Sequence, residues 1–187
     1  FLSAQYNHRT DEYGGTPEHR ARLAFEILSG IRKECGPHFL LGIRISPERY
    51  GLTLNEMLSF SQKLIDSQLI DFLDVSLWDC FMYPEEKEHQ HQTLLTHFTL
   101  LDRKNVRITV AGKISTGKNV HEVLSSGIDF VTIGRAAIIH HDYPNRVIKN
   151  PNFTPIPTPV SREHLAQEGL GASFIEYMKR WKDFVIS

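Results

Sequence analysis

Hydrophobic positions along the chain change their spacing several times. Over residues 17–35 they recur at helical intervals, which predicts a helix that Thr16 caps and that Gly36-Pro37 ends. Residues 39–45 (FLLGIRI) are too few for a helix and too apolar for a surface strand. They therefore predict a buried strand of a parallel sheet.

The same alternation continues along the chain. It predicts helices near residues 54–68, 93–102 and 117–126, and strands near residues 72–76, 107–111 and 130–133. Strands and helices that alternate at this spacing form βα units with right-handed crossovers. The expected fold class is therefore α/β, with four parallel strands.

Two regions do not follow this alternation. Residues 77–92 are expected to form a long loop, which is more often functional than idle in a compact domain. Residues 150–160 contain four prolines and predict an extended connector. A last amphipathic helix is expected after it, with one apolar stripe made of Leu170, Phe174, Met178, Trp181 and Val185.

Composition narrows the possible partners. The 187 residues are 41% hydrophobic and 23% charged, which is typical of a soluble globular protein. The 21 basic and 22 acidic side chains are scattered, so the sequence shows no footprint for nucleic acid or an anionic membrane. No apolar run approaches the ~20 residues that span a bilayer. We therefore expect a small-molecule partner.

Cysteine content and the first residues bear on compartment and completeness. Cys35 and Cys80 lie far apart in the sequence, which indicates neither a disulfide framework nor a cysteine-rich zinc site. A reducing cytoplasm fits this content. Because the chain opens on Phe1, we also expect it to be a piece of a longer protein.

Glycines follow the last two predicted strands. Gly112-Lys113 comes directly after one of them and Gly134-Arg135 directly after the other. Loops at these places commonly hold a phosphate in parallel barrels, because their backbone N–H groups are accessible and glycine has no Cβ to block an anion. A plain tight turn explains each glycine alone equally well. Because two such glycines occur in consecutive βα units, and Arg135 can add a charged contact, a phosphate site and plain tight turns explain the pattern equally well.

Arg44 lies on the opposite face of its predicted strand from Ile43 and Ile45. This places a guanidinium inside the expected barrel, near the carboxyl end of the strand. A buried cation needs an acceptor. That acceptor is either an electron-rich ring atom of a cofactor or a carboxylate such as Asp74, and the sequence leaves both open.

Residues 7–22 (NHRTDEYGGTPEHRAR) resemble the signature loop and helix of Old Yellow Enzyme-like proteins, the NADH:flavin oxidoreductase family. The segments GIRIS (42–46), AGKI (111–114) and IGR (133–135) also follow in the family's order. The resemblance thus covers about residues 1–148. It implies that Arg44 contacts the pyrimidine side of FMN and stabilises the negative charge of the reduced ring. It also implies that Gly112, Lys113, Gly134 and Arg135 hold the FMN phosphate, mostly through backbone N–H groups.

The resemblance further implies an activity, in which hydride passes from NADH or NADPH through FMN to an electron-poor alkene, enone or enoyl-type acceptor. A complete (βα)8 barrel takes about 250 residues. We therefore expect residues 1–148 to be the C-terminal half of an FMN-binding TIM barrel. Residues 149–187 would be the connector and helix that pack on the barrel. The family's catalytic residues belong to the absent half, so we expect no catalytic residue here and an inactive isolated chain.

The signature loop is expected to be structural. Asn7, Arg9 and Asp11 can form hydrogen bonds within a loop, and Gly14-Gly15 provides turn geometry. We therefore leave this loop out of the catalytic set.

Histidines are abundant, but their spacing gives no metal site of known geometry. We expect His89, His91 and His97 to be solvated loop residues, and the pair His140-His141 to lie in a surface turn. No metal is expected. Tyr50 and Trp78, just beyond two strands, either stack near the flavin or substrate or pack under a loop.

Two alternatives remain. A non-catalytic half barrel would pair through its exposed sheet edges, and two copies of the chain would then form a homo-oligomer. A phosphate-binding barrel of the aldolase or isomerase type would share only the phosphate loops, with Lys113 as the Schiff-base lysine. The signature loop has no role in such an enzyme.

Overall fold

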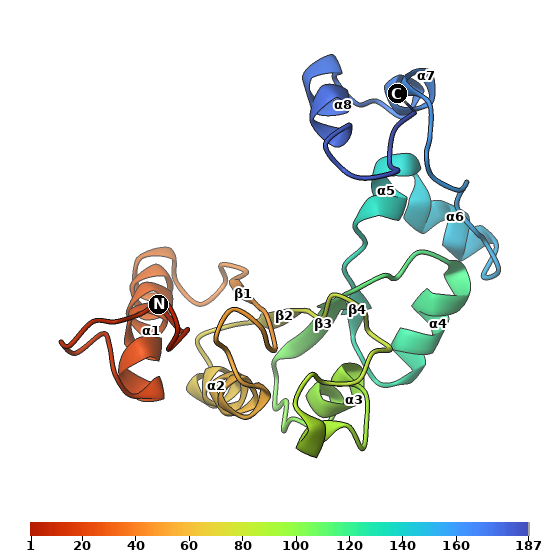
Figure 1. Cartoon of the computed structure of the whole chain (residues 1–187). Coiled ribbons are helices and arrows are strands. Elements are labelled where there is room, and N and C mark those ends of the chain that lie inside the picture. Colours follow the sequence, from red (N-terminus) through yellow and green to blue (C-terminus); the bar gives the residue numbers. More distant parts are fainter. Residues whose placement is uncertain (187) are drawn as a thin grey trace. The chain divides into compact units, whose positions relative to one another are not determined.

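The computed structural model describes residues 1–186 as eight α-helices, a short 3-10 helix and four strands (Figure 1). The strands are β1 (Gly42–Ile45), β2 (Phe72–Ser76), β3 (Arg107–Ala111) and β4 (Phe130–Val131). The helices are α1 (Pro17–Cys35), α2 (Leu54–Ser67), η1 (Lys87–His89), α3 (Leu94–Thr99), α4 (Gly117–Ser125), α5 (Arg135–Ile139), α6 (Tyr143–Lys149), α7 (Arg162–Gln167) and α8 (Ala172–Met178).

The four strands form one sheet in the order β1-β2-β3-β4, and each neighbouring pair is parallel. This confirms the predicted α/β class and its consecutive βα units. β4 is shorter than expected, because it ends at Val131 rather than Ile133. The Thr132 N–H still donates to the Val110 carbonyl at 3.0 Å. The chain then leaves the sheet to begin α5.

The sheet has one apolar face, and α2 and α3 lie on one side of the strands (Figure 1). Leu73, Val75, Ile108 and Val110 alternate along β2 and β3 and are completely buried. In β2, burial at every second position is what a strand covered on one face requires, whereas in β3 Thr109 on the opposite face is buried as well. Burial of apolar surface is favourable by ~25 cal/mol per Å², so these side chains stabilise this face of the sheet.

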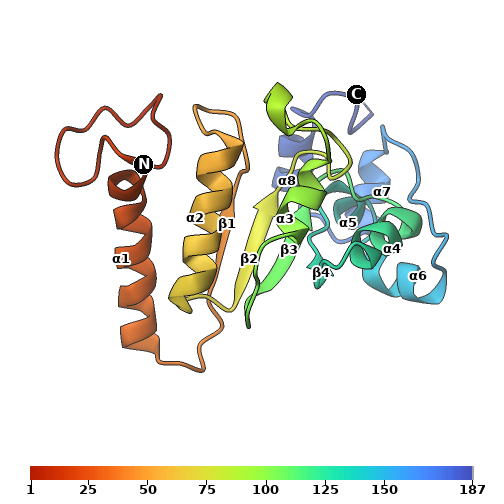
Figure 2. The same ribbon diagram turned by 90° about the horizontal axis from the view of Figure 1, so that it is seen from below.

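Threonine side chains cap the first turns of α1 and α2, and the sequence predicted the first of these caps. Thr16 accepts a hydrogen bond from the His19 N–H, and Thr53 accepts one from the Glu56 N–H, each at 3.3 Å. Figure 2 shows α1 and α2 running alongside each other. By contrast, α3 spans only residues 94–99 of the predicted 93–102, and no helix of the described residues is long and apolar enough to cross a membrane.

The chain divides into two compact units. Residues 1–112 with 126–132 form the first, which holds the sheet and α1 to α3, and residues 113–125 with 133–187 form the second. The core of the second unit consists of Ile139, Val160, Leu165, Ile175, Met178 and Phe184. The domain boundary expected at residue 148 is not tested by this division and stays a prediction.

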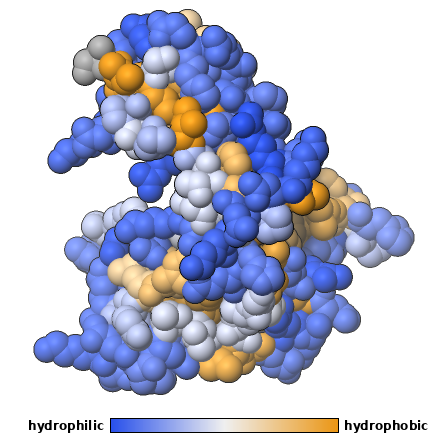
Figure 3. All heavy atoms as spheres, turned by 90° about the vertical axis from the view of Figure 1, so that its right-hand side faces the viewer, coloured by the Kyte–Doolittle hydropathy of each residue, from blue (hydrophilic) through white to orange (hydrophobic). Residues whose placement is uncertain are grey.

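The C-terminal segment differs from its prediction. In place of one long helix, α7 and α8 are separated by a turn that includes Gly169, whose φ is +89°. α8 ends at Met178, so Trp181 and Val185 reach the core from irregular chain. Phe174 is 46% exposed, and placing it on the apolar stripe was wrong. Apolar patches also show on the otherwise hydrophilic surface in Figure 3.

Candidate functional site

The loop before α1 is held together by its own polar groups. The Asn7 side-chain amide donates to the Phe1 and Tyr13 carbonyls at 2.8 and 2.7 Å. Asp11 pairs with Arg9 and accepts the Tyr13 N–H at 3.1 Å. A Cβ on Gly14 would lie 2.0 Å from the Arg9 carbonyl oxygen, so only glycine fits there. These contacts are those of the structural loop that we expected.

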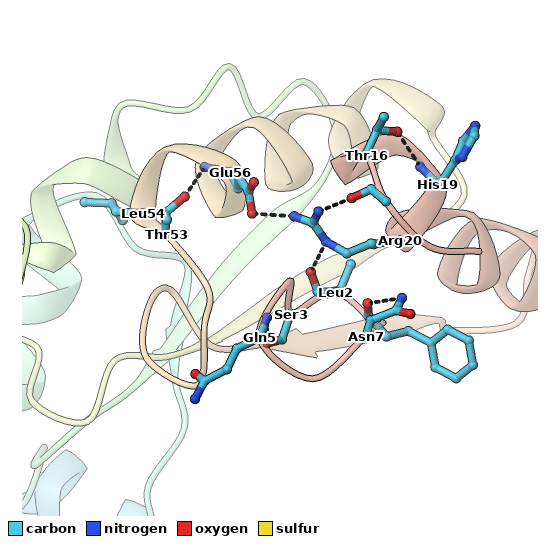
Figure 4. A network of polar contacts seen from close by, with 12 residues as sticks. Leu2, Ser3, Gln5, Asn7, Thr16, His19, Arg20, Thr53, Leu54 and Glu56 are labelled. Carbon is cyan, nitrogen blue, oxygen red and sulfur yellow. Dashed lines mark hydrogen bonds and ion pairs between the residues drawn. The ribbon is translucent and has the colours of Figure 1, made fainter. Parts of the chain in front are cut away.

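Arg20 fastens this loop to α1 and α2 (Figure 4). Its guanidinium donates to the Leu2 carbonyl at 2.6 Å and the Gly15 carbonyl at 2.5 Å, and it pairs with Glu56 at 2.7 Å. The Arg20 side chain is only 4% exposed. A buried guanidinium with three acceptors is a structural group, and no pattern in the sequence indicates its burial.

Arg44 lies in a row of polar side chains on the sheet face opposite the apolar one. Its Nη2 donates to Ser76 Oγ at 3.2 Å, and its Nε lies 3.7 Å from Asp74 Oδ2. The second distance is too long for a hydrogen bond. The Arg44 side chain is 55% exposed, so its expected burial was wrong, although its face was predicted correctly. The guanidinium therefore retains capacity to donate to a ligand.

Asp74 and two threonines continue the polar row. Thr132 Oγ1 donates to Asp74 Oδ1 at 3.4 Å and lies 3.1 Å from Thr109 Oγ1. Burial raises the pKa of Asp74 above its ordinary value, although Arg44 and Thr132 act in the opposite direction. Phe72 and Phe130 meet edge to face at 5.8 Å near the amino ends of their strands. The polar end of this face is thus the carboxyl end of the strands.

Loops after β1 and β2 meet at the same carboxyl end. Arg49 donates to Glu85 at 2.7 Å, and its guanidinium lies 4.9 Å from the centre of the Trp78 ring. The Tyr50 and Trp78 rings lie 6.3 Å apart and are 54% and 45% exposed. Arg49, Tyr50 and Trp78 also have φ between +54° and +73°, which is costly for residues with a Cβ.

The loop of residues 77–92 is held by two carboxylates, of which Glu48 is buried. Glu48, which is 2% exposed, accepts the Glu85 N–H at 2.9 Å, and Glu86 accepts the Leu54 N–H at 2.7 Å. Burial raises the pKa of Glu48, against the lowering effect of the Glu85 N–H. The long loop is therefore an ordered element.

Of the histidines near this loop, His91 is exposed as expected, but His97 is less solvated than expected. His97 is 7% exposed, and its Nε2 donates to the His89 carbonyl at 3.0 Å. Gln92 donates to His97 Nδ1 at 2.9 Å. Placing His97 in solvent was wrong, because α3 carries it inward. The same holds for His140, which is 3% exposed and caps α5, whereas the His141 side chain is 66% exposed.

The four residues expected to contact the phosphate are divided between the two compact units. Gly112 belongs to the sheet unit, where an added Cβ would lie 3.0 Å from the Asp79 and Cys80 backbone nitrogens. The close approach of the neighbouring loop is therefore a structural reason for a glycine at position 112. Lys113, Gly134 and Arg135 belong to the second unit and are exposed. An added Cβ at Gly134 would meet no atom of the described chain within 4 Å. The convergence of the four stays a prediction.

Residues 1–152 match the model of the NADH:flavin oxidoreductase / NADH oxidase family. The chain belongs to this family. The match ends close to residue 148, where the sequence resemblance also ends.

Individual relatives also match this chain over most of its length. The NADPH dehydrogenase of Bacillus subtilis (strain 168) is 30% identical over 168 residues, which are 87% of this chain and 48% of that protein. The cinnamate reductase of Clostridium sporogenes is 26% identical over 171 residues, covering 80% of this chain and 26% of that protein. The chain thus spans less than half the length of these relatives.

A solved family structure shows the fold. Morphinone reductase, in complex with tetrahydroNAD, matches with a TM-score of 0.60 and 25% identity over 88% of this chain and 42% of its own. That structure is a TIM barrel. Four consecutive parallel strands that cover two-fifths of it agree with the predicted half of a (βα)8 barrel.

Proposed function

We propose that the full-length protein is an FMN-dependent oxidoreductase that takes hydride from NADH or NADPH. The observation that carries the proposal is the exposed Arg44 guanidinium at the carboxyl end of β1, in a chain of the NADH:flavin oxidoreductase family. Ligands of parallel barrels bind at that end of the strands. When bound, FMN supplies the ring that accepts and passes on hydride.

The residues present fit such a group. Arg44 has one long contact with Asp74 and one hydrogen bond to Ser76, so it can also donate to an electron-rich ring atom. Its fixed charge would orient that ring and favour its anionic form. Asp74 and Ser76 would keep the guanidinium in place while it does so.

Phosphate recognition is assigned to Gly112, Lys113, Gly134 and Arg135. The open space at Gly134 leaves room for an anion beside its backbone, and the exposed Arg135 can add a charge-assisted hydrogen bond. The Gly112 backbone is already closely packed, so we assign it a smaller share of this contact. We assign no catalytic residue to this chain.

Tyr50 and Trp78 support the binding of a planar ligand. Both rings are about half exposed, which favours stacking on a ligand over packing under a loop. The positive φ values at both residues fit strain stored at a functional site. We assign the two rings to the region where an acceptor or the nicotinamide would lie.

The acceptor is proposed to be an electron-poor alkene, enone or enoyl compound. The names of cinnamate reductase and morphinone reductase agree with this class. We also propose a cytoplasmic location, since the free Cys35 and Cys80 form no disulfide.

The second candidate function is that of a non-catalytic half barrel, in which two copies of the chain pair through the sheet edge. The unpaired outer edge of β1 in this sheet favours it.

The absorption spectrum after addition of FMN tests the proposal. The 187-residue chain alone should bind FMN weakly or not at all and should not reduce an enone with NADH, because half of the positioning groups are missing. The full-length protein should bind FMN, with a shifted and sharpened visible band, and turn over. If the full-length protein leaves the spectrum of free FMN unchanged, the proposal is wrong.

A further inference from the structure

The second unit holds a cluster of three imidazoles around one carboxylate, where α7 meets the end of α5. We call His140, His141, His164 and Glu168 the His–Glu cluster. Glu168 is 10% exposed, and its Oε2 accepts the His141 N–H at 2.8 Å and His141 Nδ1 at 2.7 Å. Its Oε1 lies 3.8 Å from His140 Nδ1 and 3.9 Å from His164 Nε2.

The hydrogen bonds of this cluster fix which ring nitrogens carry protons. His140 Nε2 accepts the Ile156 N–H at 3.1 Å, so the neutral ring carries its proton on Nδ1. Burial lowers the pKa of His140, and the nearby Arg146 lowers it further. The ring is therefore neutral at pH 7. His164 Nε2 lies 2.8 Å from the Ile139 carbonyl oxygen, which can only accept, so this nitrogen is protonated as well.

These tautomers argue against a metal ion, although the side chains are close enough to hold one. The His140 Nδ1–H faces Glu168 and the His164 Nε2–H donates to the Ile139 carbonyl, whereas a metal needs the lone pairs of these nitrogens. The buried His140 Nδ1 has no hydrogen-bond partner among the described residues and faces the carboxylate just beyond bonding distance. The cluster is therefore a carboxylate surrounded by donors.

The donors and the carboxylate together hold the C-terminal end of α5. His164 on α7 binds the carbonyl of Ile139, the last residue of α5, and Glu168 binds the backbone two residues later. Ile139 itself is 4% exposed in the core of this unit. α5 has five residues and is ~7.5 Å long. Gly134 and Arg135 lie at its opposite, exposed end.

We propose that Glu168 is a positioning residue for the flavin phosphate, because it sets the place of α5 and so of Gly134 and Arg135. The proposal rests on the function proposed above. The Ala137 N–H donates to the Gly134 carbonyl and the His140 N–H donates to the Ala136 carbonyl, each at 3.0 Å. These backbone hydrogen bonds link the two ends of α5, so a displacement at Ile139 should reach Arg135. Binding that depends on several donors in one geometry is sensitive to such a displacement.

Riboflavin provides the test, because it carries the same ring as FMN but no phosphate. In the full-length protein, Glu168→Gln should weaken FMN binding about tenfold and leave riboflavin binding within about twofold. His164→Phe, which keeps a ring but removes the donor to Ile139, should act in the same direction. Glu163→Gln is the control, since it removes an exposed charge from the same helix, and both affinities should stay unchanged.

Each other outcome has a definite meaning. If Glu168→Gln weakens FMN and riboflavin equally, or neither, Glu168 does not position the phosphate contacts and the inference is overturned. If the unmodified protein binds both flavins equally, or if Arg135→Ala leaves their ratio unchanged, the phosphate site of the proposed function fails instead. A rise of the melting temperature of the 187-residue chain with Zn²⁺, lost in His140→Gln, would show that the cluster is a metal site and overturn its assignment as a hydrogen-bonded anchor.

Discussion

Arg44 and Asp74 are register partners on β1 and β2, and their side chains form an ion pair of 3.7 Å between Nε and Oδ2. The carboxylate is 14% exposed, but the guanidinium is 55% exposed. The pair is therefore asymmetric, because the Asp74 carboxylate is largely buried whereas the Arg44 guanidinium is accessible to a ligand. This asymmetry leads to opposite expectations for the two residues.

Replacing Arg44 should change the flavin potential. In the full-length protein, Arg44→Ala should lower the FMN reduction potential by about 30 mV or more, because it removes a positive charge that favours the anionic reduced ring. The potential can be measured by dye-coupled reduction. Arg107→Ala is the matched control, since Arg107 is 71% exposed at the start of β3 and pairs with Asp129 at 3.1 Å. An unchanged potential in Arg44→Ala would remove Arg44 from the flavin site.

Asp74 should cost stability when it is ionised. Its pKa is raised in the folded state, so the folded chain loses stability as the pH rises from the ordinary value of 3.8 through the raised pKa. Asp74→Asn should therefore raise the melting temperature at pH 7 by about 2–4 °C, the shift expected for ~1 kcal/mol in a chain of this size. The gain should vanish below about pH 3.8. A lower melting temperature of the variant at pH 7 would show that its contacts with Arg44 and Thr132 outweigh its burial.

Arg20 should be a major stabilising residue. Arg20→Met should destabilise the chain by about 3 kcal/mol in urea unfolding, because Glu56 and two backbone carbonyls lose a buried partner. Arg22→Met on the same helix should cost only about 0.5 kcal/mol, since Arg22 and Glu12 form an exposed pair. Equal losses in the two variants would contradict the anchoring role of Arg20.

Mild acid should destabilise the second unit. Burial, Arg146 and His164 lower the pKa of His140, while Glu168 and Asp142 raise it less, and the net effect is a lowered pKa. The folded chain thus binds fewer protons than the unfolded chain below the ordinary value of 6.5, and stability falls as the pH drops through this range. Glu168 also makes stability fall as the pH drops, but at lower pH, where its own carboxylate becomes protonated. Burial alone would raise its pKa, but the hydrogen bonds from His141 outweigh burial and hold the pKa low.

Thermal unfolding at two pH values checks this. Between about pH 7.5 and pH 5, the melting temperature of the unmodified chain should drop about 3 °C more than that of His140→Gln, whose side-chain oxygen can still accept the Ile156 N–H. His121→Gln, at an exposed position on α4, should retain the full pH dependence. The same drop in all three chains would show that His140 does not contribute to it.

Much of the fold follows from local sequence patterns. The Thr16 cap and the bounds of α1, β2 and β3 depend on near neighbours and lie where the sequence predicted them. By contrast, β1 begins at Gly42 rather than at residue 39. The C-terminal region depends on tertiary contacts. A stripe at helical spacing continues from Leu170 to Val185, but the chain turns after Met178 so that it can close on Val160. Periodicity alone cannot show such a turn.

The candidate site shows the same division. Strand alternation predicts the face of Arg44, because side-chain direction is a local property. It does not predict exposure, which depends on what covers the face, nor the row formed by Asp74, Thr109 and Thr132 across three segments. His97 and His140 were placed wrongly for a related reason, since a histidine becomes buried only when distant backbone groups satisfy its ring.

Anaerobic titration of the full-length, FMN-loaded protein with NADH tests the central claim most directly. The account predicts that the visible flavin absorption bleaches as NADH is added and returns when an enone is supplied. Arg44→Ala should bleach more slowly, because the anionic reduced ring loses a stabilising charge. If FMN remains bound and its absorption does not change with either NADH or NADPH, the protein is not the oxidoreductase proposed here.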